Sequence, residues 1–221
     1  MVLAFDTATP AGSVALVDGE RTLVSRYFDV GLQHGQRLFL EVEDALKVAA
    51  CTFDQLSAIA VTIGPGSFTG LRLGLSAAKG FCLARDLPLV TISTLEVLAA
   101  RLPFALCPVC PMLDARKGEV YTALYDTSAG RPRLLEGPRA LVPQALLAER
   151  AGIPTLFTGD GVLAYQDLVA ACAQARQAPF PCSRPEAGAL AWLALARLEA
   201  GEVADLASVE PEYLRGPGVG V

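Results

Sequence analysis

The sequence is poor in histidine, and this scarcity removes several classes of enzyme. Its one histidine, His34, cannot form a histidine-rich zinc site or the HExxH pair of a zinc protease. A Ser–His–Asp site would need His34 as its base, but this residue begins a predicted amphipathic helix with no serine elbow nearby. We therefore predict no catalytic residue and no metal ligand in this chain.

Basic residues and long uncharged segments are also scarce. The chain has 18 basic and 23 acidic residues, and neither half forms a basic patch, so autonomous nucleic-acid binding is not expected. The longest charge-free stretch, residues 55–71, is interrupted by Gly64-Pro65-Gly66 and cannot span a membrane as a helix. Residues 1–5 lack the basic region of a signal peptide, and the six cysteines lie in apolar segments, as buried free thiols do. We expect a cytoplasmic protein without membrane contact.

Apolar material, in contrast, is plentiful. Hydrophobic residues make up 52% of the 221 residues and charged residues 19%, which is enough for a packed core in one large or two small domains. Short apolar runs, turn signals and a stripe with a 3.6-residue period predict the order β-β-β-α-β-α-β-α in the first half. The predicted strands are residues 2–7, 13–18, 21–29, 58–63 and 88–92, and the predicted helices are 34–50, 68–85 and 94–102.

The same order begins again after a proline-rich boundary near residue 103. Two hairpins share the pattern strand, Asp, turn, Gly-x-Val, strand, once through Asp6 and Gly12 and once through Asp114 and Gly118. This repeat predicts a duplicated α/β domain. In the second half the predicted strands are residues 109–115, 119–126 and 155–158, and the predicted helices are 143–151, 162–176 and 185–200.

The first hairpin carries residue types that suit a nucleotide phosphate. Backbone amides and the small residues Thr7, Gly12 and Ser13 can surround phosphate oxygens, and the Asp6 carboxylate can hold a water of Mg²⁺. The alternative is a plain hairpin, in which Asp6 and Thr9 satisfy turn amides. Both interpretations stay open at this point.

Two other charged or glycine-rich turns raise the same question. Arg116 and Lys117 stand at the tip of the second hairpin, either as an anion clamp or as a solvated turn. The Gly64–Ser67 turn precedes a helix, which is the setting of many anion sites, but it lacks the spacing and the lysine of a P-loop.

The helix over residues 68–85 has a face of small residues. Gly70, Gly74 and Ala78 recur at every fourth position, and each glycine costs about 1 kcal/mol of helix propensity. Close approach of another element explains this cost, whether that element belongs to the same chain or to a partner. If it belongs to a partner, an arginine at Gly74 would block association without unfolding the protein.

Several segments together resemble the bacterial TsaB (YeaZ) family. The resemblance runs from residue 2 to about 215 and is carried by Phe5-Asp6-Thr7-Ala8-Thr9, by residues 61–74 (VTIGPGSFTGLRLG), by Asp114-Ala115-Arg116 with Gly118-Glu119-Val120-Tyr121, and by Pro211-Glu212-Tyr213-Leu214-Arg215. It implies an α/β fold of tandem actin-like (ASKHA, RNase H-like) domains, each a mixed sheet flanked by helices. The implied division is an N-terminal domain with partner-binding helices (1–102), a shorter C-terminal domain (103–215) and a flexible tail (216–221).

The resemblance also implies a function. Members of this family act as non-catalytic scaffold or dimerisation subunits that bind and activate TsaD, which makes N6-threonylcarbamoyladenosine next to the anticodon of tRNA. The implied partners are TsaD in a heterodimer, the P-loop ATPase TsaE, a second copy in a homodimer when TsaD is absent, and tRNA only through the complex. The implied partner interface consists of Leu40, Val48, Gly70, Leu71, Gly74 and Ala78.

The chain departs from TsaD where that protein binds its catalytic metal. The H-x-x-x-H pair of TsaD falls on Thr94 and Leu98, and leucine cannot ligate a metal while threonine is a poor ligand for iron or zinc. The adenosine motif of TsaD is also missing, since the nearest match, Gly159-Asp160-Gly161, reads as a turn. We therefore expect no intrinsic cofactor, and weak binding of ATP or ADP with Mg²⁺, no tighter than roughly 100 µM.

Two rival functions remain. An autonomous actin-like ATPase or small-molecule kinase would need a general base and a nucleotide-gripping second domain, and the sequence supplies only Asp6. A glycoprotease, an older label of this superfamily, would need metal ligands that one histidine cannot provide.

Overall fold

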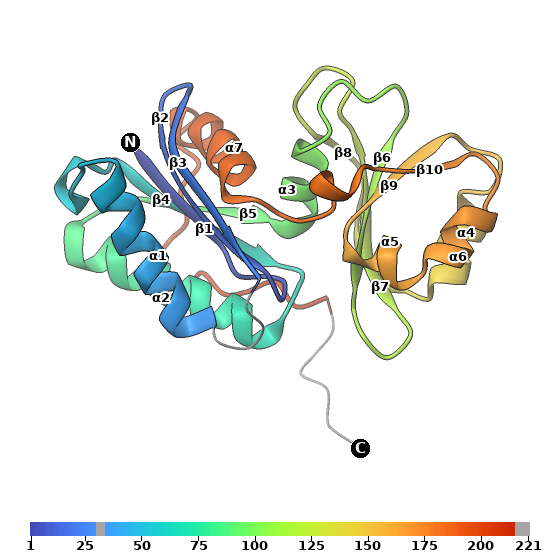
Figure 1. Ribbon diagram of the computed structural model, residues 1–221, viewed down its shortest axis with the longest axis horizontal. Helices are drawn as coiled ribbons and strands as arrows, with labels where there is room; N and C mark the ends of the chain where they lie inside the picture. The colour runs from blue at the N-terminus through green and yellow to red at the C-terminus, as the bar shows by residue number, and fades with distance from the viewer. Residues whose placement is uncertain (30–33, 215–221) are drawn as a thin grey trace. The chain divides into compact units, whose positions relative to one another are not determined.

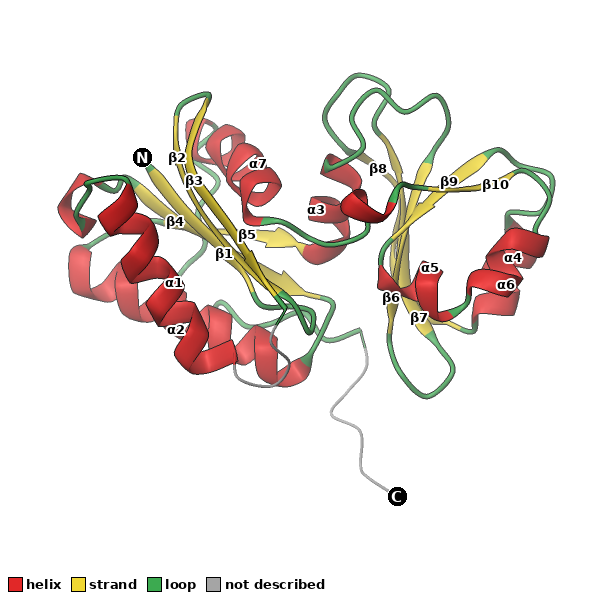
Figure 2. Ribbon diagram, viewed as in Figure 1, coloured by secondary structure: helices red, strands yellow, loops and turns green. Residues whose placement is uncertain are grey.

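The computed structural model describes residues 1–29 and 34–214, and it describes residues 34–36 by their backbone only. The predicted tail at residues 216–221 lies outside the described residues. The chain forms two compact units, each built on one sheet (Figures 1 and 2).

The boundary between the units differs from the expected division at residues 102 and 103. The first unit joins Met1–Thr94 to Pro185–Glu212, and the second contains Leu95–Arg184. The expectation of two consecutive domains is therefore wrong for the last part of the chain. Its helix α7 (Ala187–Glu199) buries Leu190, Ala191 and Ala194 and packs on the first sheet.

The first unit is a five-stranded mixed sheet with helices on both faces. The strand order is β3-β2-β1-β4-β5, in which β1 pairs antiparallel with β2 and parallel with β4. Helices α1 and α2 cover one face and α7 covers the other (Figure 1). The element bounds are β1 Val2–Asp6, β2 Gly12–Asp18, β3 Arg21–Phe28, α1 His34–Val48, β4 Ala58–Gly64, α2 Phe68–Arg85 and β5 Leu89–Ser93, with a short 3-10 turn, η1, at Phe53–Gln55.

The second unit repeats this arrangement. Its strand order is β10-β9-β6-β7-β8, in which β6 pairs antiparallel with β7 and parallel with β9. One face buries its core against α4, α5 and α6, and the other against α3. The element bounds are α3 Thr94–Ala100, β6 Val109–Asp114, β7 Val120–Asp126, β8 Arg133–Leu141, α4 Pro143–Glu149, β9 Thr155–Thr158, α5 Asp160–Ala164, α6 Gln166–Ala171 and β10 Ala175–Gln177, followed by a 3-10 turn, η2, at Phe180–Cys182.

The predicted duplication is confirmed by the topology. In each sheet the first strand lies between the second and the fourth, and the same pairs are antiparallel or parallel. The two mixed sheets flanked by helices are also as expected. Strands β8 and β10 were not predicted, and the helix expected over residues 162–176 is divided between α5, α6 and β10.

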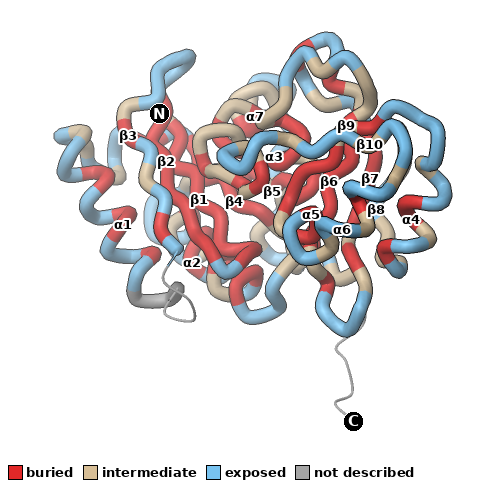
Figure 3. The backbone as a smooth tube through the Cα atoms, turned by 45° about the vertical axis from the view of Figure 1, so that its right-hand side comes forward, coloured by how far each residue is buried: buried red, intermediate tan, exposed pale blue. Residues whose placement is uncertain are grey.

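The most deeply buried residues lie on the central strands of the two sheets. The central strands β1, β2, β4 and β6 are buried almost throughout, whereas α1 presents an exposed outer side (Figure 3). No helix in the described ranges is long and apolar enough to cross a membrane.

Candidate functional site

The end of β1 places Asp6 inside the first unit. Its side chain is fully buried, and the hydroxyl of Thr62 on β4 donates a hydrogen bond of 2.5 Å to Asp6 Oδ1. The backbone N–H of Ala8 donates to the same oxygen at 3.3 Å. The sequence analysis did not find Thr62 as the partner of Asp6, although a threonine in an otherwise apolar strand is a signal for such a contact. The carboxylate therefore joins two neighbouring strands at their carboxyl ends.

The other residues of the predicted phosphate loop are also engaged inside the protein. Thr7 Oγ1 donates to the carbonyl of Gly70 at 2.8 Å, and Ser13 Oγ accepts from the N–H of Ala187 at 2.9 Å, at the start of α7. Gly12 lies against the Phe28 ring, where a side chain would not fit. The structure thus brings Asp6, Thr7, Gly12 and Ser13 together, but as a packed junction. Nucleotide binding at this hairpin stays a prediction.

The face of small residues on α2 packs within the first unit. A Cβ on Gly70 would collide with the Thr7 carbonyl, and a Cβ on Gly74 would collide with the Thr7 hydroxyl. Leu71 and Ala78 are fully buried. The expectation that Gly70, Leu71, Gly74 and Ala78 meet a partner is therefore wrong, because the turn after β1 lies against the two glycines and the other two side chains are buried within the unit.

The glycine-rich turn before α2 serves the same packing. The N–H of Ser67 donates to the Ala8 carbonyl at 2.7 Å, and a Cβ on Gly66 would collide with that carbonyl. Ser67 then caps the helix by accepting the N–H of Gly70 at 3.3 Å. The two candidate anion turns of the first unit therefore contact each other.

Two of the six expected interface residues do lie at the surface. Leu40 is 54% exposed and Val48 68% exposed, both on α1. Phe39 of α1 and Leu83 of α2 are also exposed, at 48% and 73%. The exposed surface of α1 and α2, hereafter the α1–α2 face, is defined by these four residues. Phe39 and Leu40 are neighbours in the chain, and exposed apolar side chains that lie together at a surface are typical of a protein–protein contact.

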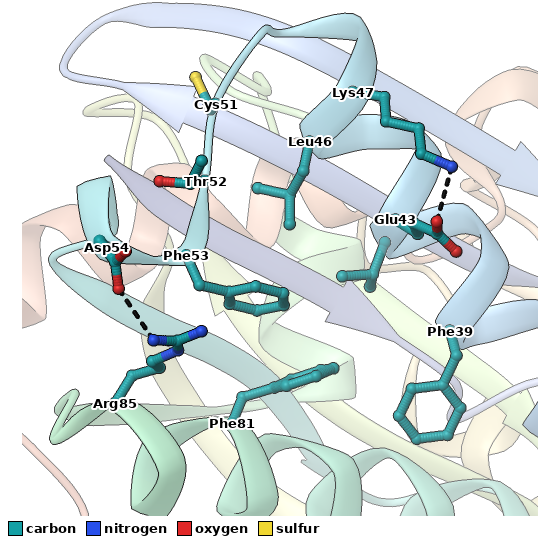
Figure 4. A pocket seen from close by; sticks show the side chains of 11 residues that line it. Phe39, Glu43, Leu46, Lys47, Cys51, Thr52, Phe53, Asp54, Phe81 and Arg85 are labelled. Carbon is teal, nitrogen blue, oxygen red and sulfur yellow. Dashed lines mark hydrogen bonds and ion pairs between the residues drawn. The ribbon is translucent and has the colours of Figure 1, made fainter.

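A pocket of about 560 Å³ opens on the same side of the unit (Figure 4). Its apolar part is built around Phe81 of α2, whose ring centroid lies 5.9 Å from that of Phe39 and 5.0 Å from that of Phe53. Two ion pairs, Lys47–Glu43 at 2.6 Å and Arg85–Asp54 at 3.0 Å, complete the lining.

The pocket combines an apolar interior with charged groups of both signs. The hydrogen bond to the Glu43 carboxylate raises the pKa of Lys47. None of the three phenylalanines was predicted from the sequence to belong to a site. This combination suits an apolar side chain of a partner with polar groups around it.

The second hairpin carries a different group of residues. Asp160 Oδ1 accepts the N–H of Asp114 at 3.0 Å, and Asp160 Oδ2 lies 3.7 Å from Arg184 Nη1. Burial raises the pKa of Asp160. Arg116 pairs with Asp114 at 3.2 Å, and Arg116 and Lys117 are both exposed at the hairpin tip.

The Gly159-Asp160-Gly161 segment was expected to be a turn, but it forms the N-terminal end of a helix. It leads into α5, and a Cβ on Gly159 would collide with the carbonyl of Met112 on β6.

The two positions that the resemblance sets against the metal ligands of TsaD are in the core. Thr94 and Leu98, at the two ends of one turn of α3, are both fully buried. Within the described ranges, no group of three or more His, Cys, Asp or Glu side chains is arranged to hold a metal ion.

Comparison with known proteins agrees with this architecture. The family model described as "TsaD: tRNA N6-adenosine threonylcarbamoyltransferase" matches residues 29–219. A crystal structure described as similar to peptidase YEAZ, from Pseudomonas aeruginosa, is 30% identical, covers 97% of this chain and 99% of that chain, and has a TM-score of 0.83. The ethanolamine utilization protein EutJ from Carboxydothermus hydrogenoformans shares the fold alone, at 12% identity and a TM-score of 0.52. The protein is thus a tandem actin-like (ASKHA) α/β protein.

Its relatives narrow the assignment. The protein named "tRNA threonylcarbamoyladenosine biosynthesis protein TsaB" of Bacillus subtilis is 31% identical over 97% of this chain and 93% of that protein. The Escherichia coli protein of the same name is 41% identical, but that match spans 56% of this chain and 54% of the relative. The chain belongs to the TsaB (YeaZ) family.

Proposed function

We propose that this protein takes part in the biosynthesis of N6-threonylcarbamoyladenosine in tRNA, as a non-catalytic subunit that binds and activates TsaD. The names of the B. subtilis and E. coli relatives support the pathway. The α1–α2 face is the observation that carries the role, because it offers a partner exposed apolar side chains beside an apolar pocket.

The same face serves a second copy of the chain when TsaD is absent. An isologous contact needs protruding groups and a receiving surface on one patch. Leu40 is exposed next to Phe39, and Phe39 lines the pocket around Phe81, so this part of the face offers both an apolar side chain and a surface that can receive one. The homodimer and the heterodimer with TsaD therefore compete for one surface. TsaE and tRNA join through the complex, in the cytoplasm.

Two observations support the non-catalytic part of the proposal. Leu98 cannot ligate a metal, and Thr94 is buried beside it in α3. In addition, Asp6 Oδ1, Thr7 Oγ1 and Ser13 Oγ each form a hydrogen bond with a protein group, which leaves these atoms poorly prepared to hold a phosphate or its Mg²⁺. Binding of ATP or ADP with Mg²⁺ is therefore weak, no tighter than roughly 100 µM.

A reconstituted tRNA modification assay with three arms tests the proposal. The arms contain this protein alone, TsaD alone, or both together, each with TsaE, tRNA and threonylcarbamoyl-adenylate. We expect modified tRNA only when both proteins are present. Product from this protein alone would make it an enzyme, and full activity of TsaD alone would remove its activating role. ATP turnover in a separate sample that contains this protein without TsaE would favour the rival ATPase function.

A further inference from the structure

The inner side of α1 contains a buried charge. Glu41 is 5% exposed, although its neighbours on that side of the helix are the apolar core residues Leu38, Val42 and Ala45. Burying a carboxylate is costly unless it is paired and hydrogen-bonded.

Glu41 is paired from two directions. Arg26 Nε on β3 lies 2.9 Å from Glu41 Oε2, and Arg37 contacts the other carboxylate oxygen from one turn earlier in α1. Arg26 also reaches Asp44, with Nη1 3.6 Å from Oδ2. A single guanidinium on an edge strand therefore contacts two carboxylates one turn apart on the helix.

The contacts of Arg26 restrain the rotation and the position of α1 on the sheet, which its apolar contacts alone do not determine. An apolar stripe tolerates small rotations and shifts of a helix, because its attraction has no direction. The guanidinium fork of Arg26 has a direction, because its Nε contacts Glu41 at 2.9 Å while its Nη1 forms a longer ion pair with Asp44. Together these contacts restrain the rotation and the register of the helix on the sheet. The residues adjacent to Glu41 are Leu40, on the α1–α2 face, and beyond it Phe39, whose ring contacts Phe81 in the pocket.

We infer that Arg26 and Glu41 are positioning residues for partner binding. They hold α1 in the rotation that presents Leu40 outward and keeps Phe39 against Phe81, and so they keep the α1–α2 face in its binding shape. This inference rests on the proposed function, since it assumes that the α1–α2 face binds TsaD.

The test compares three variants by their dissociation constants for TsaD. In Arg26→Met the Glu41 charge loses its partner on the sheet, and we expect affinity to fall at least tenfold. In the double variant Arg26→Met with Glu41→Met no buried charge is left unpaired, since Arg37 and Asp44, which lose these partners, are both exposed. Stability should therefore recover, as buried pairs replaced by apolar residues often allow. Affinity should stay low in this variant, because the fork that orients α1 is still missing. Arg21→Met, on the same strand and exposed, is the matched control and should bind like the unchanged protein.

Two further readouts separate positioning from a purely structural role. Thermal melts establish that each variant is folded at the assay temperature. In the tRNA modification assay, the concentration of this protein needed for half-maximal rate should rise in Arg26→Met, while the rate at saturation should be retained.

The inference is overturned if the double variant regains normal affinity, or if Arg26→Met binds TsaD within twofold of the unchanged protein. A fourth variant, Leu40→Asp, shows whether such an outcome concerns only the positioning role or the proposed function itself. If Leu40→Asp loses affinity and Arg26→Met does not, only the positioning role is wrong. If neither variant loses affinity, the α1–α2 face is not the binding surface and both proposals fall.

Discussion

The two units share one topology, but the residues at the end of their first strands, β1 and β6, differ. In the first unit, the aspartate that ends β1 is fully buried and hydrogen-bonded by a threonine of the neighbouring parallel strand, with glycines closing the turn around it. In the second unit, the aspartate that ends β6 is partly exposed, and a second aspartate and two arginines surround it. Equivalent positions therefore form a packed junction in one unit and a charged, partly exposed group in the other.

This difference shows which part of a duplicated fold is free to change. The sheet order and the strand pairing require only apolar strands and a turn, so both units keep them. The residues at the strand ends do not determine the topology and can take on local roles. In the first unit they hold the turn after β1 against α2, the helix that forms one side of the α1–α2 face.

The largest effect that we predict concerns the glycines of α2. Gly74→Arg should leave no cooperatively folded first unit at 25 °C, because a charged side chain would have to enter a space filled by Thr7 and Val61. This replaces the sequence-based expectation of a folded monomer. Gly80→Arg is the control, since no atom lies within 4 Å of its Cβ position on the same helix. Circular dichroism with thermal melts distinguishes the two, and a folded Gly74→Arg protein would show that the first unit is less tightly packed than described.

A smaller effect is expected at two buried threonines, Thr62 on β4 and Thr158 on β9. Thr62→Val should cost about 2 kcal/mol of unfolding free energy, because the buried Asp6 carboxylate loses a charge-assisted hydrogen bond. Thr158→Val, at the end of β9, removes a hydrogen bond of 2.9 Å to the carbonyl of Cys182 and should cost about 1 kcal/mol. Urea denaturation measures both. Equal losses of unfolding free energy would mean that the hydrogen bond from Thr62 to the Asp6 carboxylate is no stronger than an ordinary neutral one.

The smallest effect concerns the pH dependence of stability at Asp160. Because burial raises its pKa, the folded state holds this proton more tightly than the unfolded state does. The resulting stabilisation is present below the ordinary pKa of 3.8 and is lost as pH rises through the raised value. The Asp160→Asn variant does not titrate at this position, so it does not lose this stabilisation as pH rises. The free energy of unfolding of the variant minus that of the unchanged protein should therefore be larger at pH 7 than at pH 3. A difference in stability that does not vary with pH would contradict the raised pKa.

The repeat and most of the elements could be predicted because they depend on local patterns. The hairpins around Asp6 and Asp114 carry their own turn signals, and the stripe of α1 has a clear period. The strands that were missed, β8 and β10, lie at sheet edges and are largely exposed, so they lack an alternating apolar pattern.

The site was harder to predict, because it depends on contacts between distant segments. The spacing of Gly70 and Gly74 correctly indicated a close approach, but not that the approaching element was the turn at Thr7. In the same way, nothing local in α7 shows that it returns to the first sheet. Leu40 and Val48 could be found because they lie off the buried stripe of α1, whereas Phe53 and Phe81 belong to the pocket only through the packing of η1 on α2.

We propose that the first unit, and not the second, carries the surface that binds TsaD. Two leucines of nearly equal exposure allow the two units to be compared, Leu40 on α1 at 54% and Leu134 on β8 at 51%. The measurement is the dissociation constant of the TsaD complex for Leu40→Asp and for Leu134→Asp, by titration calorimetry with folded proteins. We predict at least a tenfold rise for Leu40→Asp, about 1.4 kcal/mol, and a change within twofold for Leu134→Asp. Equal losses in both variants, or a larger loss for Leu134→Asp, would contradict the account.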